Sequence, residues 1–134
     1  MAYMNIDKIL CDYFSKMPGL ISLFLFGSFA KNQATATSDI DVAAYYLHDH
    51  APTYEQCMAI QQDLSDLIHK DVDFICLNRA SPIIAMQVYK EGKELLITNQ
   101  KEHGKYLIQL FNQYAELKQL RKPMEEALLK RKIQ

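Results

Sequence analysis

The chain has 134 residues and a mass of 15.5 kDa, which is enough for one domain of ordinary size. Hydrophobic residues make up 49% of it and charged residues 23%, so it has enough apolar side chains for a core. Its 15 basic and 16 acidic side chains give a formal net charge of −1. That balance argues against a protein held to nucleic acid by bulk charge.

The ends of the chain and its cysteines bear on location. The longest apolar run, residues 20–26, contains Ser22 and is far too short to span a membrane. Residues 1–7 lack the basic and then apolar pattern of a signal peptide. The three cysteines are widely spaced and form no CxxC pair, which indicates buried thiols in a reducing compartment. We therefore expect a cytoplasmic protein without membrane contact.

The first third of the chain predicts a helix and two strands. Apolar side chains recur at helical spacing over residues 6–17, and Pro18-Gly19 ends that helix. Residues 20–26 are almost all apolar, which is typical of a strand covered on both faces. Residues 39–47 predict a second strand, which we expect beside the first across an irregular connection.

The middle third predicts a helix, a strand and a short helix. The first helix opens at Pro52-Thr53, and its inward stripe comprises Cys57, Ile60, Gln61, Leu64, Leu67 and Ile68. Residues 72–77 predict the strand. Ser81-Pro82 has the form of an N-cap followed by proline at the first helical position, and Gly92 ends the short helix.

The last third predicts a short strand over residues 94–98 and a long helix that starts near Asn99. The main apolar stripe of this helix comprises Tyr106, Leu110, Gln113, Leu117, Leu120 and Met124. Pro123 is expected to end or kink the helix, because proline lacks the backbone N–H that a helix interior uses.

The resulting order of elements, α-β-β-α-β-α-β-α, predicts an α/β (α+β) fold with a small mixed β-sheet flanked by helices. We expect residues 1–134 to form a single domain. Its core would span about residues 5–98, and a C-terminal helical extension would span about residues 99–134.

Two aspartates in the predicted second strand carry the first chemical signal. Asp39 and Asp41 are two residues apart, so on a strand they point to one face, roughly 6.5–7 Å apart at the backbone. Like charges this close repel, and a chain that keeps them usually offers them a shared cation. Oxygen ligands without His or Cys favour Mg²⁺ or Mn²⁺ over zinc. A solvated strand edge is the alternative.

Residues on either side of this pair extend the signal. Gly27-Ser28 ends the first strand, where close backbone approach and a hydroxyl suit a phosphate. Asp73, the only acid inside the third strand, is the candidate third carboxylate of a two-metal site, where it would also deprotonate an acceptor hydroxyl. Lys31 is a further candidate for contact with the phosphates, with a solvated loop lysine as the alternative.

Other polar residues point mainly to packing or solvent. Asp71 is expected to cap the third strand or face solvent, and Arg79 either contacts a nucleotide or partner or is solvated. The four histidines show no metal-ligand spacing. Self-modification is an alternative for Tyr45, Tyr46 and Tyr106.

The Gly-Ser pair, ten residues and then Asp-x-Asp resemble the signature of the polymerase-β-type nucleotidyltransferase superfamily. Residues 72–89 (VDFICLNRASPIIAMQVY) are similar to the minimal MNT nucleotidyltransferases, which act as antitoxins beside HEPN ribonuclease toxins. The resemblance covers about residues 5–98 and, more loosely, the C-terminal helix. Cys76 stands where members often carry a further acid, which points to Asp73 as the catalytic one.

This resemblance implies an activity and a partner. Such antitoxins transfer AMP from ATP to a tyrosine hydroxyl of the cognate HEPN toxin and so neutralise it. By the same resemblance Asp39, Asp41 and Asp73 bind two Mg²⁺ ions, and Gly27 and Ser28 hold the triphosphate of ATP. A hetero-oligomer with the toxin is expected.

The charge of the chain is unevenly distributed. From Lys118 onward six basic and two acidic residues give +4, and the other nine basic and fourteen acidic residues give −5. A basic tail after an amphipathic helix suggests that a protein partner binds through the C-terminal helix, and the resemblance implies that this partner is the toxin. A solvated helix end or weak RNA contact is the alternative for this tail.

Two other functions stay open at this point. One is transfer to a small molecule or to RNA, although the short chain lacks a second domain that would clamp a substrate such as an aminoglycoside. The other is a non-catalytic antitoxin that masks its toxin by binding. The intact pair Asp39 and Asp41 argues against the second, because binding alone has no need of it.

Overall fold

A computed structural model of the chain describes residues 5–27, 30 and 39–133, with side chains through residue 130. Its elements follow one another as α1 (Ile6–Ser15), β1 (Leu20–Phe26), β2 (Ile40–Tyr46), η1 (His48–His50), α2 (Tyr54–Ile68), β3 (Val72–Cys76), α3 (Pro82–Glu91), β4 (Lys93–Ile97) and α4 (Gln100–Ile133). This is the predicted order, with the 3₁₀ turn η1 added. The predicted α/β (α+β) fold with a small mixed sheet is confirmed.

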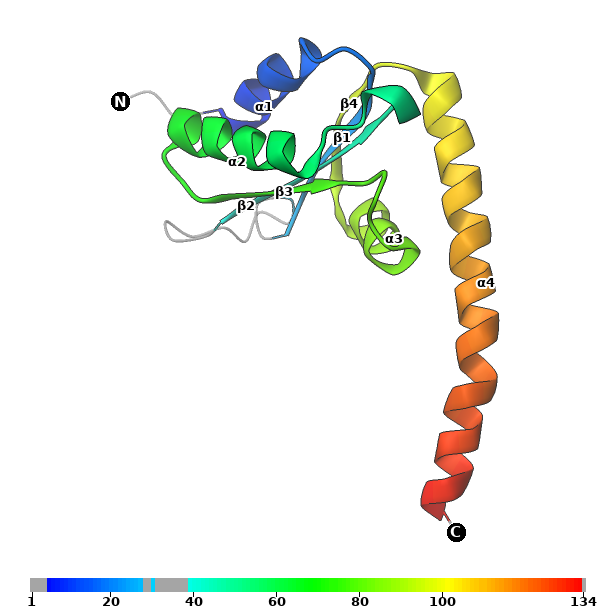
Figure 1. The fold of residues 1–134 in the computed structure, drawn as a ribbon. Helices are drawn as coiled ribbons and strands as arrows, with labels where there is room; N and C mark the ends of the chain where they lie inside the picture. Colours follow the sequence, from blue (N-terminus) through cyan, green and yellow to red (C-terminus); the bar gives the residue numbers. More distant parts are fainter. Residues whose placement is uncertain (1–4, 28–29, 31–38, 134) are drawn as a thin grey trace.

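The four strands form one sheet in the order β3-β2-β1-β4. Strand β1 pairs antiparallel with β2 and β4, and β2 pairs parallel with β3. The predicted neighbourhood of the first two strands is therefore confirmed, and β3 forms one edge of the sheet. Helices α1 and α2 cover one face, while α3 and the first turns of α4 lie on the other (Figure 1).

Side-chain caps fix two helix starts where the sequence predicts them. Thr53 and Gln56 form a reciprocal capping box at the start of α2. At the start of α3 the Ser81 side chain accepts a hydrogen bond from the Ile84 N–H, and proline occupies the first turn. These caps position the loops that precede both helices.

Two apolar cores lie on opposite faces of the sheet. The core under α1 and α2 includes Leu10, Phe14, Leu23, Val42, Leu64 and Phe74. The core under α3 and α4 includes Phe24, Ala43, Leu77, Met86, Tyr106 and Leu110. Since side chains alternate along β2, Val42 points to the first core and Ala43 to the second. Asp41 therefore shares the face of Ala43, on which α3 lies.

Several side chains of the predicted inward stripes are exposed instead. Leu67 is 51% exposed, because it lies beside the face of α2 that buries Ile60, Leu64 and Ile68. Leu120 and Met124 are each 68% exposed. They lie on the half of α4 that extends beyond the sheet and α3 (Figure 1).

Pro123 lies inside α4 and does not end it. Of the two predicted effects of Pro123, a helix end or a kink, the helix end is therefore wrong. Proline removes one backbone donor and frees the carbonyl of Gln119, which lies on exposed helix surface where water can satisfy it. The helix therefore continues to Ile133. Among the described helices none is both long and apolar enough to cross a membrane.

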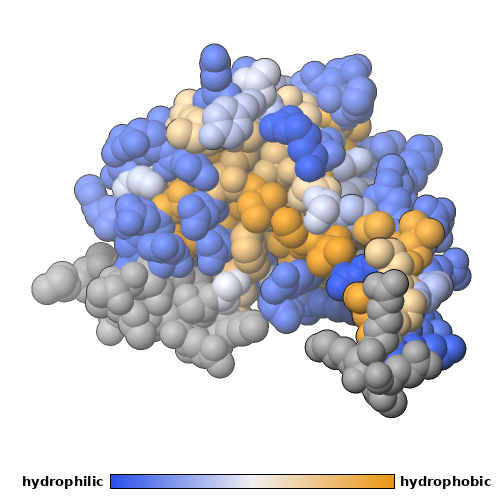
Figure 2. Space-filling model, turned by 60° about the horizontal axis from the view of Figure 1, so that its bottom comes forward, coloured by the Kyte–Doolittle hydropathy of each residue, from blue (hydrophilic) through white to orange (hydrophobic). Residues whose placement is uncertain are grey.

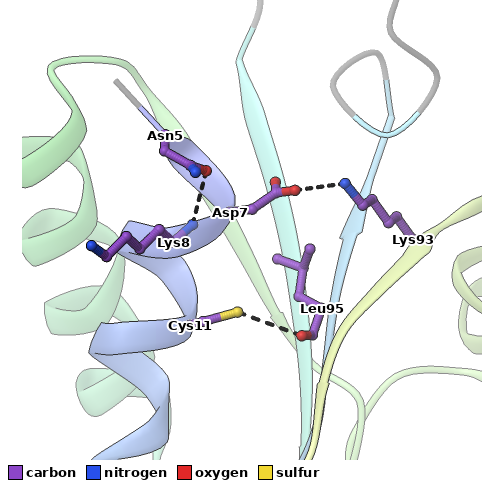
Figure 3. A network of polar contacts seen from close by, with 6 residues as sticks. All are labelled: Asn5, Asp7, Lys8, Cys11, Lys93 and Leu95. Carbon is purple, nitrogen blue, oxygen red and sulfur yellow. Dashed lines mark hydrogen bonds and ion pairs between the residues drawn. The ribbon is translucent and has the colours of Figure 1, made fainter. Parts of the chain in front are cut away.

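Polar contacts attach α1 to β4, the edge strand opposite β3 (Figure 3). Lys93 Nζ lies 2.6 Å from a carboxylate oxygen of Asp7, and Cys11 Sγ donates to the Leu95 carbonyl oxygen at 3.5 Å. All three cysteines are free, but only Cys76 is fully buried. The prediction of buried thiols is therefore confirmed for Cys76, whereas Cys11 and Cys57 are only partly buried.

Candidate active site

Two carboxylates face each other across adjacent strands. Asp41 of β2 and Asp73 of β3 are register partners in the parallel pair. Register partners point to the same face of a sheet. Asp39 directly precedes β2 and lies close enough for its charge to act on Asp41. Asp41 is half-buried, whereas Asp39 and Asp73 are exposed. The structure thus brings together the three carboxylates that the sequence singles out.

The crowding of charge changes the acidity of the central carboxylate. Burial raises the pKa of Asp41 above its usual range, and the negative charges of Asp73 and Asp39 raise it further. The ionised form of Asp41 is therefore disfavoured in the absence of a positive partner. A bound cation would reverse that effect.

Gly27 brings the end of β1 against the same carboxylate. Its φ is +74°, a left-handed conformation that favours glycine. A Cβ atom at this position would overlap with Asp41 Oδ2. The register explains this closeness, because Phe26, the preceding residue, is the partner of Asp41 in the antiparallel pair. The backbone at Gly27 is therefore close enough to contact a ligand that the Asp41 carboxylate binds.

The chemistry of the three donors fits a hard divalent cation. Each supplies carboxylate oxygens and no His or Cys stands among them, which favours Mg²⁺ or Mn²⁺. Across residues 5–27, 30 and 39–133, no group of three His, Cys, Asp or Glu side chains is already arranged to hold a metal ion. The fit therefore rests on the donor chemistry and on the closeness of the carboxylates.

The remaining predicted residues have different outcomes. Ser28 and Lys31 lie outside the described residues. Arg79 Nη2 donates to the Pro52 carbonyl oxygen at 2.5 Å and to Cys57 Sγ at 3.5 Å. The Arg79 side chain therefore bonds to the start of α2 and not to the carboxylates.

Three other residues are placed as packing or solvent groups. Asp71 is exposed, as predicted, and its carbonyl oxygen accepts from the Ile40 N–H at 2.9 Å. Tyr46 and Tyr106 are buried, and burial raises the pKa of both hydroxyls. Their burial argues against self-modification at either position.

A hollow of about 460 Å³ lies on the carboxylate face, further along β2 and β3. Tyr45, the start of α3 and the α4 residues Tyr106 and Gln113 line it. Sequence reasoning gave these residues packing roles and missed the hollow. The signal that could have found it is the polar Gln113 within the apolar stripe of α4.

Comparison with known proteins gives the family. A family model described as polymerase beta nucleotidyltransferase matches residues 8–102. The protein adenylyltransferase MntA of Shewanella oneidensis is 31% identical over 104 residues, which cover 76% of this chain and 72% of that protein.

Solved structures agree with this match. A chain of a toxin–antitoxin complex with AMP-PNP has a TM-score of 0.79 at 25% identity, covering 94% of this chain and 99% of its own. A chain of the complex between tri-AMPylated Shewanella oneidensis HEPN toxin and MNT antitoxin shares the fold, with a TM-score of 0.73, 24% identity and coverage of 93% and 96%. Because the family model spans most of the chain and the three carboxylates lie close together, the chain belongs to the polymerase β nucleotidyltransferase family.

Proposed function

We propose that this nucleotidyltransferase is a cytoplasmic antitoxin that transfers AMP from ATP to a tyrosine hydroxyl of a HEPN ribonuclease toxin and so neutralises it. The observation that carries the proposal is the register pair of Asp41 and Asp73, with Asp39 beside it. The protein adenylyltransferase MntA and the toxin–antitoxin complex with AMP-PNP support the choice of reaction and partner. The segment 72–89 supports the HEPN class of toxin.

The three carboxylates have distinct roles in this proposal. Asp39 and Asp41 hold two Mg²⁺ ions, for which Mn²⁺ can substitute, and Asp73 holds one of them. When bound, the metal would reduce the repulsion between the phosphates and an incoming oxygen and stabilise charge on the leaving group. The raised pKa of Asp41 supports this role, because a cation relieves the repulsion that Asp73 and Asp39 exert on it.

Asp73 is also the proposed base. The acceptor oxygen forms a bond to the α-phosphorus of ATP as the bond to pyrophosphate breaks, and Asp73 takes the phenol proton. Its position suits this role, because its side chain is exposed and β3 is an edge strand that a partner can approach. Gly27 and Ser28 are proposed to hold the triphosphate, with Lys31 in contact with it.

The toxin is proposed to bind along α4. Leu117, Leu120, Met124 and Leu128 recur at helical spacing, and the last three are 60–68% exposed. Figure 2 shows apolar side chains gathered along this end of the helix. An exposed apolar row on a helix that extends away from the body needs a covering partner.

Charge indicates the chemistry of the covering surface. A groove of about 350 Å³ runs between Ile83 of α3 and the α4 segment from Tyr114 to Glu125, and Lys118, Arg121 and Lys122 line it. Lys118 also lies over the Tyr114 ring, 5.0 Å from its centre. The fitting surface of the toxin is therefore apolar with acidic side chains at its rim.

Label transfer from ATP tests the function. The wild type, Asp41→Asn and Asp73→Asn are each incubated with ATP labelled at the α-phosphate, Mg²⁺ and the HEPN toxin encoded beside this gene. We expect label on the toxin with the wild type and none with either variant. Asp12→Asn is the matched control, because this acid is exposed on α1, which covers the opposite face of the sheet.

A cellular assay separates catalysis from masking. If Asp41→Asn protects cells from the toxin as well as the wild type does, and no label is transferred, the protein acts by binding alone. That result would overturn the enzymatic proposal.

A further inference from the structure

One polar side chain lies in the inward stripe of α2. Gln61 stands next to Ile60 and three residues before Leu64, which are both buried in the core. A polar amide among apolar side chains is costly unless it is hydrogen-bonded. Gln61 is half-buried, and its Oε1 accepts a hydrogen bond from the Phe74 N–H at 2.8 Å. The amide therefore joins α2 to the backbone of β3, the strand that contains Asp73.

The N–H that Gln61 binds points away from the other strands. Successive N–H groups along a strand point to opposite edges, and β3 forms one edge of the sheet. The Leu77 N–H donates to the Ala44 carbonyl oxygen of β2 at 2.8 Å, so the Phe74 N–H, three residues earlier, points away from β2. An N–H on an open sheet edge is available to water or to another chain. In this fold α2 supplies its acceptor.

This hydrogen bond fixes the peptide unit that follows Asp73. The Phe74 N–H and the Asp73 carbonyl group belong to one planar unit, in which they point in opposite directions. Because Gln61 holds the N–H, the carbonyl group points toward β2. The contact therefore restricts rotation of the backbone at Asp73, and with it the direction in which the Asp73 side chain leaves the strand.

The side chains on the two sides of this peptide unit point to opposite faces of the sheet. Phe74 packs in the core under α1 and α2, where its ring stacks on Phe14 with centres 5.6 Å apart. Asp73, the preceding residue, therefore projects from the other face, where its register partner Asp41 lies. A contact within the α2 core thus reaches the carboxylates through a single peptide unit.

Repulsion between the carboxylates gives this contact a task. Burial and then the negative charge of Asp73 raise the pKa of Asp41, so the two carboxylates are close enough to repel each other. Strand β3 has five residues and lies at the edge of the sheet, so it pairs with one neighbouring strand, β2. The hydrogen bond from Phe74 to Gln61 opposes a shift or rotation of β3 directly beside Asp73.

We infer that Gln61 is a positioning residue for Asp73, which it holds in the orientation that binds a divalent metal and takes the proton of the acceptor hydroxyl. The inference rests on the proposed function, in which Asp73 has both roles. Gln61 acts through the backbone, from the opposite face of the sheet.

Two substitutions separate the hydrogen bond from the shape of the side chain. Gln61→Met has a similar length and lacks the acceptor oxygen, whereas Gln61→Glu keeps an acceptor there. We expect Gln61→Met to lower kcat for AMP transfer about tenfold with little change in KM for ATP, and Gln61→Glu to keep most of the activity. Gln62→Met is the matched control and should match the wild type, because Gln62 is exposed and donates to Asp66 of the same helix at 2.9 Å.

Metal binding gives a readout that needs no toxin. Mn²⁺ is titrated into the full-length wild type, Gln61→Met, Asp73→Asn and the double variant, and bound metal is measured by electron paramagnetic resonance. We expect Gln61→Met to weaken Mn²⁺ binding about tenfold when Asp73 is present. In the Asp73→Asn background it should have no further effect, because the residue through which Gln61 acts has been changed.

Amide hydrogen exchange reports on the contact itself. Exchange of the Phe74 N–H should be about fivefold faster in Gln61→Met and close to the wild-type rate in Gln61→Glu. NMR of the full-length proteins measures both rates. If Gln61→Met does not fold, Gln61→Asn, which is one methylene shorter, takes its place in all three measurements.

Three results would overturn the inference. One is wild-type kcat and Mn²⁺ affinity in Gln61→Met despite faster Phe74 exchange, which would give the bond a purely structural role. Another is an equal loss of Mn²⁺ affinity with and without Asp73, and the third is a Gln61→Glu variant as impaired as Gln61→Met. If the wild type transfers no AMP to the toxin, the proposed function fails, and the Mn²⁺ cycle and the exchange rates still decide whether Gln61 positions Asp73.

Discussion

Asp41 and Asp73 lie directly opposite each other on the parallel strands β2 and β3, and the turn at Gly27 closes over Asp41 from β1. Three neighbouring strands therefore supply the site, and none of the three residues is adjacent to another in sequence. A change at any one of them acts on the same carboxylate group.

Replacing Asp41 with asparagine should abolish transfer without unfolding the protein. We expect activity to fall about 10²-fold or more, because a developing charge loses its stabilisation. The melting temperature of the metal-free protein should stay equal or rise, since one of three crowded negative charges is removed. Thermal unfolding with and without Mg²⁺ checks this. Mg²⁺ should stabilise the wild type and leave Asp41→Asn unchanged; stabilisation of both proteins to the same extent would contradict the assignment.

A glycine pair in this chain offers a matched test of backbone geometry. At Gly27 the φ of +74° and the overlap of a Cβ atom with Asp41 predict that Gly27→Ala lowers the free energy of unfolding by about 1–3 kcal/mol. At Gly104, inside α4, a Cβ atom would meet nothing within 4 Å. Gly104→Ala should therefore stabilise the protein by about 0.5–1 kcal/mol. Urea unfolding measures both, and a neutral Gly27→Ala would show that the turn does not press on Asp41.

The fold and the three carboxylates could be predicted from the sequence because both depend on local patterns. Alternation along residues 39–47 places Asp39 and Asp41 on one face whatever the sheet order. The partnership of Asp41 with Asp73 needs only a parallel neighbour in register. Neither the alternation along the strand nor the pairing of the two strands depends on how the helices pack.

Features that depend on tertiary packing were not predictable in this way. Leu67 and Leu120 fit helical stripes, but α2 reaches the core with a narrower face and α4 extends past the body. Pro123 signals a helix end locally, yet the exposed helix around it tolerates the lost hydrogen bond. The hollow beside Tyr106 exists only because α3 and α4 meet at one end of the sheet. The periodicity of apolar residues does not show where α3 and α4 pack relative to each other.

Tyr13 should make stability fall at alkaline pH. Burial first, and then its hydrogen bond to Asp63 at 2.9 Å, raise its pKa to about 12, whereas an unfolded tyrosine has a pKa of about 10. Between these values the folded state holds more protons than the unfolded state, so the free energy of unfolding falls as pH rises. In Tyr13→Phe this fall should be shallower. Urea unfolding at several pH values between about 10 and 12 checks the slope, and parallel curves for both proteins would refute the prediction.

The apolar row on α4 should control affinity for the toxin and not the stability of the chain. Leu120→Asp and Leu128→Asp should each weaken toxin binding about tenfold or more. Because both side chains are at least 60% exposed, the free energy of unfolding should change by no more than about 0.5 kcal/mol. Glu126→Gln, on the opposite side of the helix, is the control. Titration calorimetry with the toxin measures affinity, and equal affinity of all variants would exclude this surface.

The intact mass of the HEPN toxin tests the central claim most directly, namely that Asp39, Asp41 and Asp73 support transfer of AMP to a partner. The toxin is incubated with ATP, Mg²⁺ and either the wild type or Asp41→Asn, and its mass and modified residue are read by mass spectrometry. We predict that the wild type adds one or more adenylyl groups at tyrosine and that Asp41→Asn adds none. A toxin that forms a stable complex with the wild type yet keeps its unmodified mass would contradict the account.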